Sequence, residues 1–335
     1  MRVLGIDARG ISARGGSASG GDAGPGAGVA HATRELIEEL EKYSSEYGIK
    51  LHVYREKMGG WRLSRALRRD GISHVLIPSG AVSPFIRGAV FPWIHDLAIF
   101  DHPEWFPQSA FKRFVTTNLF LNGLKRAKHI FSVSEDTRRA AADKSGVDAS
   151  NITVTYQGIK TSFLHGRNLY QREPYALILG TVEPRKNISF ITDLWDDVRL
   201  RVPEARIVVA GKRGWGNVRL GKAEVVDRFD DVKRDELLKN ASMLLLPSLH
   251  EGFGRTALEA MALGVPVIAS KRGAIPEVVG EVGVLLDPED RQAWIQAIVN
   301  GFEGRLDGKL GIERVKRFSW EKTARIMLAK IDECW

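Results

Sequence analysis

Two glutamates separated by seven residues, Glu251 and Glu259, are the side chains of this sequence with the clearest potential for chemistry. They lie in the segment PSLHEGFGRTALEAMALGVPVIAS, residues 247–270. The Gly-Phe-Gly turn between them lets the backbone approach a ligand closely, because glycine adopts conformations that other residues resist. A helix beginning near Thr256 would offer free N–H groups and the positive end of its dipole to a phosphate. Glu259 could then accept hydrogen bonds from a ribose diol, and Glu251 would face the group beyond the phosphates.

Two adjacent cations follow a second strand-like run, in the segment LGTVEPRKN, residues 179–187. The strand is expected to end at Gly180, and Arg185 and Lys186 come just past it. Ligands of open α/β sheets bind outside the carboxyl ends of the strands. A diphosphate suits this pair, because Arg grips it through two parallel hydrogen bonds and Lys acts as a point charge.

The elements that must position these residues alternate between strand and helix in both halves of the chain. The first half opens with an apolar run ending at Asp7, a glycine-rich stretch at 14–28 and a helical pattern from Val29 onward, which is typical of a doubly wound α/β unit. Strand-like runs follow at 51–54, 74–78, 90–95, 129–134 and 152–156, and in the second half at 175–181, 206–211, 242–248, 266–270 and 282–287.

The 335-residue length agrees with two domains of roughly 150 residues each. The strand–helix rhythm restarts near 165–175, and a polar linker is expected at 164–173. We therefore predict an α/β protein with two Rossmann-like domains, residues 1–165 and 166–318. The last segment, 319–335, is predicted to be a helix that packs back on the first domain.

The charge of the chain is concentrated in its first half. The whole chain carries +8, from 49 Lys and Arg against 41 Asp and Glu, and residues 1–165 contain 22 basic and 16 acidic side chains. Such an excess indicates an anionic partner: nucleic acid, a phosphorylated small molecule or an anionic membrane surface. Segment 61–71 is either a basic amphipathic helix that lies on lipid or an ordinary solvated helix. The aromatic-rich segment 100–114 either lines an acceptor site or packs internally.

Several classes of protein and of site are excluded. The single cysteine, Cys334, allows no disulfide framework and no cysteine-based metal site, and the eight histidines lack metal-ligand spacing. The start of the chain has no secretory pattern, and no apolar run reaches the length of a membrane span. We expect a cytoplasmic protein, with peripheral contact at the inner membrane face left open.

Taken together, these segments resemble the family 4 (group 1) retaining glycosyltransferases of GT-B fold, which transfer a sugar from a nucleotide sugar. The likeness covers nearly the whole chain. In the first half it rests on GPGAGVAHATREL, WIHDLAIFDHPEWFP and RAKHIFSVSEDTRRAAADKSGVDASNITVTYQGI, and in the second on GTVEPRKN, VVAGKRGW and EGFGRTALEAMALGVPVIAS. The resemblance implies two Rossmann-like domains facing across a cleft, with the acceptor bound by the first, the donor by the second, and a C-terminal helix crossing back.

The resemblance also implies a role for each matching residue. Glu251 matches the glutamate that contacts the donor sugar and supports the transition state, and Glu259 matches the one that holds the ribose hydroxyls. Lys186 and Arg185 match the diphosphate clamp, and His95 matches the histidine at the reaction centre. The other donor-binding matches are Phe253, Gly254, Thr256, Ala257, Gly26 and Gly28. Many relatives carry an arginine where this chain has Thr181, so Arg185 or Arg213 is expected to take over that role.

The function implied is transfer of a hexose from GDP-mannose or a UDP-sugar to a hydroxyl of a glycan or lipid-linked acceptor, with retained configuration. No metal and no cofactor besides the nucleotide sugar is expected, since no Asp-x-Asp triplet is present. The alternative is a nucleotide-sugar epimerase or another nucleotide-binding enzyme that uses the same cleft. The G-x-G-x-x-G fingerprint of NAD enzymes is missing, and the basic residues match no nucleic-acid-binding module. Nucleic acid is therefore not an expected partner.

Overall fold

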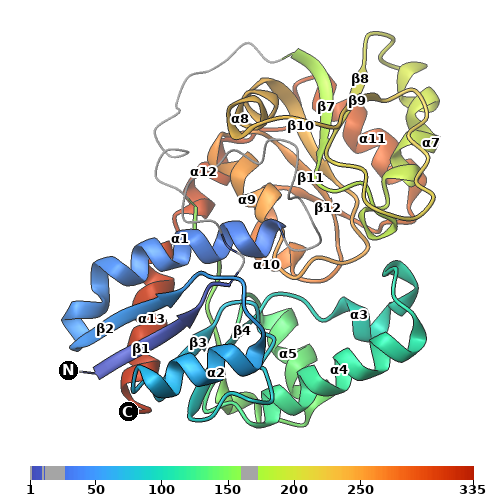
Figure 1. Cartoon of the computed structure of the whole chain (residues 1–335). Coiled ribbons are helices and arrows are strands. Elements are labelled where there is room, and N and C mark those ends of the chain that lie inside the picture. Colours follow the sequence, from blue (N-terminus) through green and yellow to red (C-terminus); the bar gives the residue numbers. More distant parts are fainter. Residues whose placement is uncertain (1, 10, 12–26, 160–172) are drawn as a thin grey trace.

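The computed structural model describes residues 2–9, 11, 27–159 and 173–335. They form two α/β domains that are stacked one above the other in Figure 1, each built on a six-stranded sheet. All the pairings within the two sheets are parallel. Parallel sheets are covered by helices on both faces, which accounts for the continuous apolar runs that predicted the strands.

The sheet of the first domain has the strand order β2-β1-β3-β4-β5-β6. Its strands are β1 (Arg2–Asp7), β2 (Ile49–Tyr54), β3 (His74–Ile77), β4 (Ala89–Ile94), β5 (Ile130–Ser132) and β6 (Ile152–Val154). The helices are α1 (Ala27–Tyr43), α2 (Gly60–Arg69), α3 (Ala98–Asp101), α4 (Ala110–Lys125) and α5 (Glu135–Ser145). Single 3-10 turns lie at η1 (Ser44–Tyr47), η2 (Pro103–Trp105) and η3 (Ala149–Asn151).

The sheet of the second domain has the order β12-β11-β10-β7-β8-β9. Its strands are β7 (Glu173–Leu179), β8 (Arg206–Ala210), β9 (Glu224–Val226), β10 (Ala241–Leu246), β11 (Val267–Ser270) and β12 (Val284–Leu286). The helices are α7 (Ile188–Arg199), α8 (Asp231–Asn240), α9 (Arg255–Ala262), α10 (Ile275–Val279), α11 (Arg291–Phe302) and α12 (Lys309–Val315). The 3-10 turns are η4 (Pro184–Lys186) and η5 (Gly280–Val282).

The predicted α/β class and the two Rossmann-like sheets are confirmed, with two differences in detail. Strand β9 has only three residues, Glu224–Val226, and its short exposed sequence gave no strand signal. The predicted linker ends too late, because Glu173 and Pro174 already belong to β7. The rest of that predicted linker, and the boundary at 165/166, fall within 160–172, outside the described residues.

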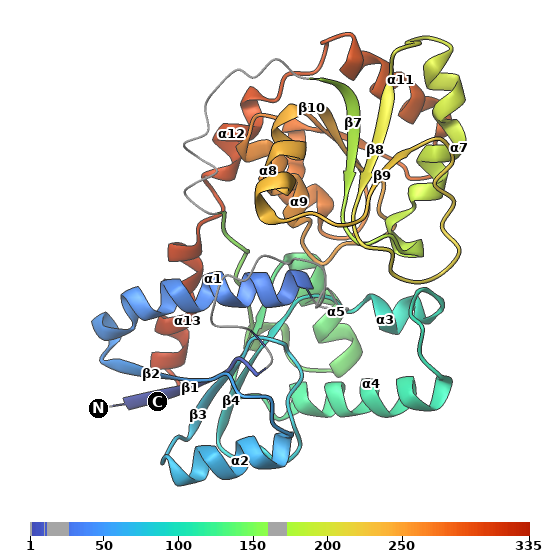
Figure 2. The same cartoon turned by 45° about the horizontal axis from the view of Figure 1, so that its top comes forward.

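Helix α13 (Trp320–Asp332) leaves the second domain and packs along α1 of the first, as predicted (Figure 2). Its first turn is capped by Ser319, whose side chain accepts a hydrogen bond from the backbone N–H of Lys322. Further along, Arg325 pairs with Glu46 at 2.7 Å. The indole of Trp335 stacks on His74 with 4.0 Å between the ring centroids. The C-terminus is thereby fixed to the first domain.

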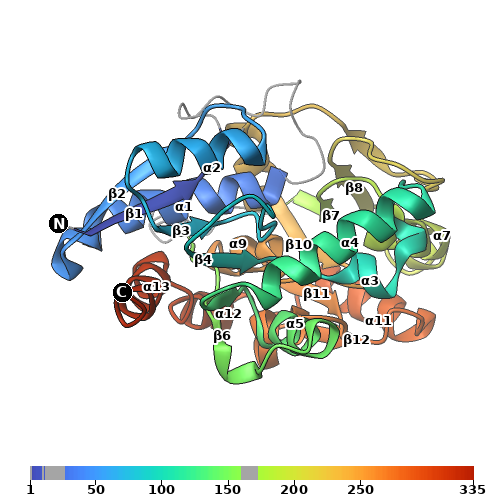
Figure 3. The same cartoon turned by 60° about the horizontal axis from the view of Figure 1, so that its bottom comes forward.

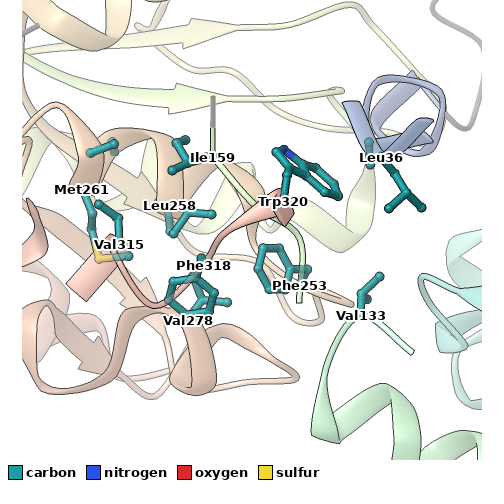
Figure 4. Packing of buried hydrophobic residues seen from close by; sticks show 14 of the residues in the cluster. Leu36, Val133, Ile159, Phe253, Leu258, Met261, Val278, Val315, Phe318 and Trp320 are labelled. Carbon is teal, nitrogen blue, oxygen red and sulfur yellow. The ribbon is translucent and has the colours of Figure 1, made fainter. Parts of the chain in front are cut away.

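One apolar cluster runs without interruption from the first domain into the second. Trp320 lies at the junction, beside Leu36 of α1 and close to Phe253 of the second domain (Figure 4). Its indole N–H donates to the Glu35 carboxylate at 3.0 Å, so the buried polar edge of the ring is satisfied. Gly158 comes so close that a Cβ there would lie 2.2 Å from the backbone nitrogen of Trp320. The two domains therefore share a core at this end.

We expect Gly158→Ala to lower the free energy of unfolding by about 1–3 kcal/mol, because the added methyl group overpacks the junction against backbone. Urea unfolding followed by tryptophan fluorescence measures this change. Gly59→Ala is the matched control, since a Cβ at Gly59 meets nothing within 4 Å. An equal effect of the two substitutions would contradict the close approach at Gly158.

Candidate donor site

The carboxylate of Glu251 is buried and surrounded by hydrogen-bond donors. It lies on the segment between β10 and α9, and it accepts hydrogen bonds from Lys186 Nζ at 2.5 Å and from Ser248 Oγ at 2.7 Å. Arg185 Nη1 donates to its other oxygen at 3.2 Å. Burial raises the pKa of Glu251, but the charges of Lys186 and Arg185 outweigh burial and lower the pKa to about 2. Glu251 is therefore anionic at neutral pH.

Arg185 belongs to the turn η4 and is held mainly by protein acceptors. Its Nη2 donates to Glu183 at 2.7 Å, and its Nη1 donates to the carbonyl of His250 at 2.8 Å. Burial alone would lower the pKa of Arg185, but the nearby carboxylates, Glu251 first among them, raise it. The guanidinium thus holds the η4 turn and the Glu251 segment together at the carboxyl ends of β7 and β10.

The first domain contributes one carboxylate, that of Asp96, to this segment. Asp96 follows β4, and its carboxylate lies 3.2 Å from His250 Nε2 and 3.8 Å from Arg185 Nη1. Burial lowers the pKa of His250, but the hydrogen bond and the charge of Asp96 outweigh burial and raise it above the usual value. The cleft is therefore bridged by an ion pair directly beside Glu251.

His95, next to Asp96, has a fixed ring. Its Nε2 lies 2.8 Å from the carbonyl oxygen of Pro78, and its Nδ1 lies 3.4 Å from the amide nitrogen of Gln157. Burial lowers the pKa of His95 to about 4, so the imidazole is neutral at pH 7. The Gln157 amide oxygen is buried without a hydrogen-bond partner among the described residues. A ligand hydroxyl would satisfy it.

Gly252 explains why the turn after Glu251 must begin with glycine. A Cβ at this position would lie 1.8 Å from the carbonyl oxygen of His95, across the cleft. The next glycine, Gly254, has a φ of 96° and precedes α9, which begins at Arg255, one residue before the predicted start. The turn thus serves both the contact between the domains and the start of α9.

Glu259 lies one turn into α9, as predicted, and is paired with two arginines. Arg255 Nε donates to one oxygen at 3.0 Å, and Arg234 of α8 lies 3.1 Å from the other. Arg255 also donates to Glu35 of α1 at 2.5 Å. Burial raises the pKa of Glu35, but His31 and Arg255 outweigh burial and lower it to about 2. A chain of three charged groups, Glu259, Arg255 and Glu35, therefore runs from the predicted ribose-binding residue into the first domain.

Comparison with known proteins identifies the family. The sequence profile described as "Glycosyl transferases group 1" matches residues 173–303. O-antigen chain mannosyltransferase B of Escherichia coli is 31% identical over 255 aligned residues, covering 68% of this chain and 66% of that protein. O-antigen chain mannosyltransferase RfbU of Salmonella typhimurium is 30% identical over 253 residues, covering 72% and 68%. The aligned part spans about two thirds of each relative.

The chain belongs to the group 1 glycosyltransferases. Its fold is similar to that of sucrose-phosphate synthase from Thermosynechococcus elongatus, at a TM-score of 0.73 and 19% identity, covering 98% of this chain and 97% of that one. HepE of Anabaena, solved with UDP and glucose, gives a TM-score of 0.71 at 15% identity, covering 99% and 100%. At these identities the likeness concerns the fold alone, and it confirms the predicted GT-B architecture.

The predicted site residues of this glycosyltransferase fall into two groups. Glu251, Lys186, Arg185 and His95 gather around the contact between the domains, and Phe253, Gly254, Thr256, Ala257 and Glu259 lie on the turn and first helical turn that follow. The side chain of Phe253 is buried in the shared core, so its backbone alone faces the turn. Arg213 is exposed on the loop after β8, where a parallel bridge joins it to Val182.

The two predicted glycines of the N-terminal loop are only partly accounted for. Gly28 is exposed near the start of α1, and a Cβ there would meet nothing within 4 Å. No close approach therefore requires glycine at this position in the structure. Gly26 lies outside the described residues. Their predicted role in the donor site stays a prediction.

Sequence reasoning missed the charged residues that join the two domains. The sequence predicted no functional role for His250, Arg255, Glu35 or Glu277. The Glu277 carboxylate accepts hydrogen bonds from the N–H groups of Glu135 at 2.8 Å and Asp136 at 2.7 Å, and so caps α5 across the cleft. A Pro-Glu pair at the start of a short helix was the only local signal, and it carries no information about a distant partner.

Glu251→Gln is expected to destabilise the folded protein at neutral pH by on the order of 3 kcal/mol, because it removes the anion that Lys186 and Arg185 stabilise. Since the folded-state pKa of Glu251 is lowered, this stability is fully present above about pH 5 and is lost as the pH falls toward 2. Urea unfolding at several pH values should therefore show the gap to wild type closing in acid. A gap that stays constant with pH would contradict this, and Glu289→Gln, at an exposed site, is the control.

Asp96→Asn is expected to lower the pKa of His250 below its wild-type value, because the strongest opposition to burial, the charge of Asp96, is removed and only the charges of Asp136 and Glu251 remain. NMR titration of the histidine ring nitrogens measures the shift. His52, which is more exposed and pairs with Asp70 rather than Asp96, serves as the internal reference. An unchanged His250 titration would mean that the ion pair across the cleft does not form in solution.

Proposed function

We propose that this glycosyltransferase moves a hexose from a nucleotide-diphosphate sugar to a hydroxyl of a glycan or lipid-linked acceptor, with retention of the anomeric configuration. The observation that carries the proposal is the buried, anionic Glu251 held between two cations at the carboxyl ends of β7 and β10. A site of this kind offers positive charge to a diphosphate and a carboxylate to sugar hydroxyls within one cleft.

GDP-mannose is the first candidate donor, and a UDP-sugar is the second. The two O-antigen relatives are named as mannosyltransferases, which favours a mannosyl donor. HepE was solved with UDP and glucose, which supports a UDP-sugar as the second candidate. The names of the O-antigen relatives also favour a carbohydrate acceptor.

In the proposed reaction the bond between the anomeric carbon and the β-phosphate oxygen breaks while the acceptor oxygen bonds to the same face of that carbon. The acceptor proton passes to the departing phosphate oxygen, so no protein nucleophile is required. Lys186, Arg185 and the backbone amides at the start of α9 stabilise the charge that develops on the diphosphate. Glu251, already ionised, stabilises positive charge on the sugar ring.

His95 is assigned the role of a neutral hydrogen-bonding group at the sugar. Its lowered pKa keeps the imidazole uncharged at pH 7, so it would not repel the developing positive charge of the sugar. We propose that the unpartnered Gln157 oxygen beside it accepts a hydrogen bond from a sugar hydroxyl. The positive charge needed at the diphosphate comes from side chains and helix amides, which supports a reaction that requires no metal.

The test is to incubate the purified protein with GDP-, UDP-, ADP- and dTDP-sugars, with and without EDTA. We expect donor turnover with one nucleotide class, unchanged by EDTA, and NMR of the first product formed should show the anomeric configuration of the donor. Turnover abolished by EDTA, or an inverted product, would contradict the corresponding part of the mechanism. Conversion of the donor to an epimeric nucleotide sugar, without transfer or hydrolysis, would indicate an epimerase instead.

Variants of the two glutamates separate their roles. Glu259→Gln is expected to weaken nucleotide binding about tenfold or more, and Glu251→Gln is expected chiefly to lower kcat, by about a hundredfold. Calorimetric titration of the nucleotide and steady-state kinetics measure the two effects. Glu289→Gln, at an exposed position, is the matched control. Wild-type behaviour of both variants would overturn the site assignment.

A further inference from the structure

One side of the first domain is formed by α2, the segment 82–88 and α4, which are joined by direct contacts. Ser64 of α2 donates a hydrogen bond to the carbonyl of Phe85 at 2.6 Å. Arg126, just after α4, donates to the carbonyl of Ile86 at 2.7 Å. Figures 1 and 2 both place α2 and α4 on the side of the first domain that faces away from the second domain, and Figure 3 looks onto this side. We call it the outer face.

The outer face carries positive charge without any negative charge of its own. Residues 60–69, 82–88 and 110–128 contain ten lysines and arginines and no aspartate or glutamate. The next acid along the chain, Asp70, is paired with Arg69 at 2.8 Å. The ten cations are Arg62, Arg65, Arg68, Arg69, Arg87, Lys112, Arg113, Lys125, Arg126 and Lys128. Without these ten cations, residues 1–165 contain 12 basic and 16 acidic side chains, so the net positive charge of the first half of the chain comes from this face.

Large apolar side chains protrude from the same surface. On α4, Phe111 is 78% exposed and Phe114 is 66% exposed, and Val115 and Leu119 continue the exposed stripe along the helix. Trp61 at the start of α2 and Phe85 between the helices are also more than half exposed. Side chains three and four residues apart share one helix face, so α4 presents an apolar strip to solvent with lysines at its edges.

Helix α2 has its own apolar side on the core, where Leu63 and Leu67 are buried. The leucines of segment 61–71 therefore lie as expected for an ordinary solvated helix, not for one that buries its apolar side in lipid. Its arginines and Trp61 remain on the outside. The apolar component of the outer face comes mainly from α4, which the sequence did not single out.

We propose that the outer face docks on an anionic lipid surface. Exposed aromatic side chains are stabilised at the boundary between headgroups and acyl chains, and flanking lysines and arginines are attracted to anionic headgroups. The charge complementarity decides between occupants, since a second copy of this chain would bring ten like charges against ten. Docking through this face leaves the cleft open, because the face points away from the second domain.

The inference does not depend on the proposed sugar transfer, and lipid binding can be measured without a donor. The test is co-sedimentation of the full chain with vesicles of phosphatidylcholine alone and of phosphatidylcholine mixed with phosphatidylglycerol. We expect binding to the mixed vesicles only. Phe111→Ser with Phe114→Ser should lower the partition coefficient at least about tenfold. Each of Arg62→Gln, Arg65→Gln and Lys112→Gln should lower it roughly fivefold.

Leu200→Ser with Val232→Ser is the matched control, because both side chains lie exposed on the second domain, at 82% and 76%. This control should bind as wild type does, and circular dichroism should show every variant folded. Equal binding to both kinds of vesicle, or an unaffected Phe111/Phe114 variant, would overturn the proposal. A lipid-free dimer that the Phe111/Phe114 variant converts to monomer would assign the face to a second copy, and preferential binding to a DNA duplex would assign it to nucleic acid.

Discussion

A carboxylate buried away from water must be paired with cations or N–H groups, and this requirement shapes the whole cleft. Glu251, Glu259 and Glu35 are each at most 9% exposed. Each takes a positive partner from a different segment: Glu251 from η4, Glu259 from α8, and Glu35 from α9. A sheet that misplaced one of these segments would remove a charged partner from a buried carboxylate. The proposed donor-binding residues are therefore positioned by the same electrostatic constraint that fixes the fold around them.

The two domains meet through contacts of two physical kinds. At the Trp320 end the contact is apolar and belongs to the core, so separating the domains there would expose buried surface. At the cleft the contacts are polar: Glu277 caps α5, and His250 pairs with Asp96. Polar groups can exchange a protein partner for water at small net cost. The structure thus combines one end where separating the domains is costly with a cleft where it is not, and the proposed substrate-binding residues lie at the cleft.

The sequence predicted most of the fold and the local part of the site, for a physical reason. Buried parallel strands require apolar runs, and a helix start requires a turn such as Gly-Phe-Gly, so β1–β8, β10–β12 and α9 left local patterns. Strand β9 did not, since a three-residue edge strand needs no apolar face. The pairing of Arg255 with Glu35 joins residues 220 positions apart, and no spacing rule links them. The orientation of Arg185 toward Glu251, rather than outward, was equally a tertiary property.

The outer face is a second feature that the sequence alone did not predict. The amphipathic period in 61–71 indicates that the helix has an apolar and a polar side. It does not show whether the apolar side packs on the sheet or on an outside partner. In the structure Leu63 and Leu67 of that side are buried in the core. Helix α4 lacks a clear period, because Phe111 and Phe114 face solvent while Leu124 faces the sheet. Apolar residues all around a helix are expected where both sides are covered. Among the described residues only one side of α4 is covered, so we propose that the other side is apolar because it meets a partner outside the chain. The basic surroundings of that side favour an anionic surface as this partner.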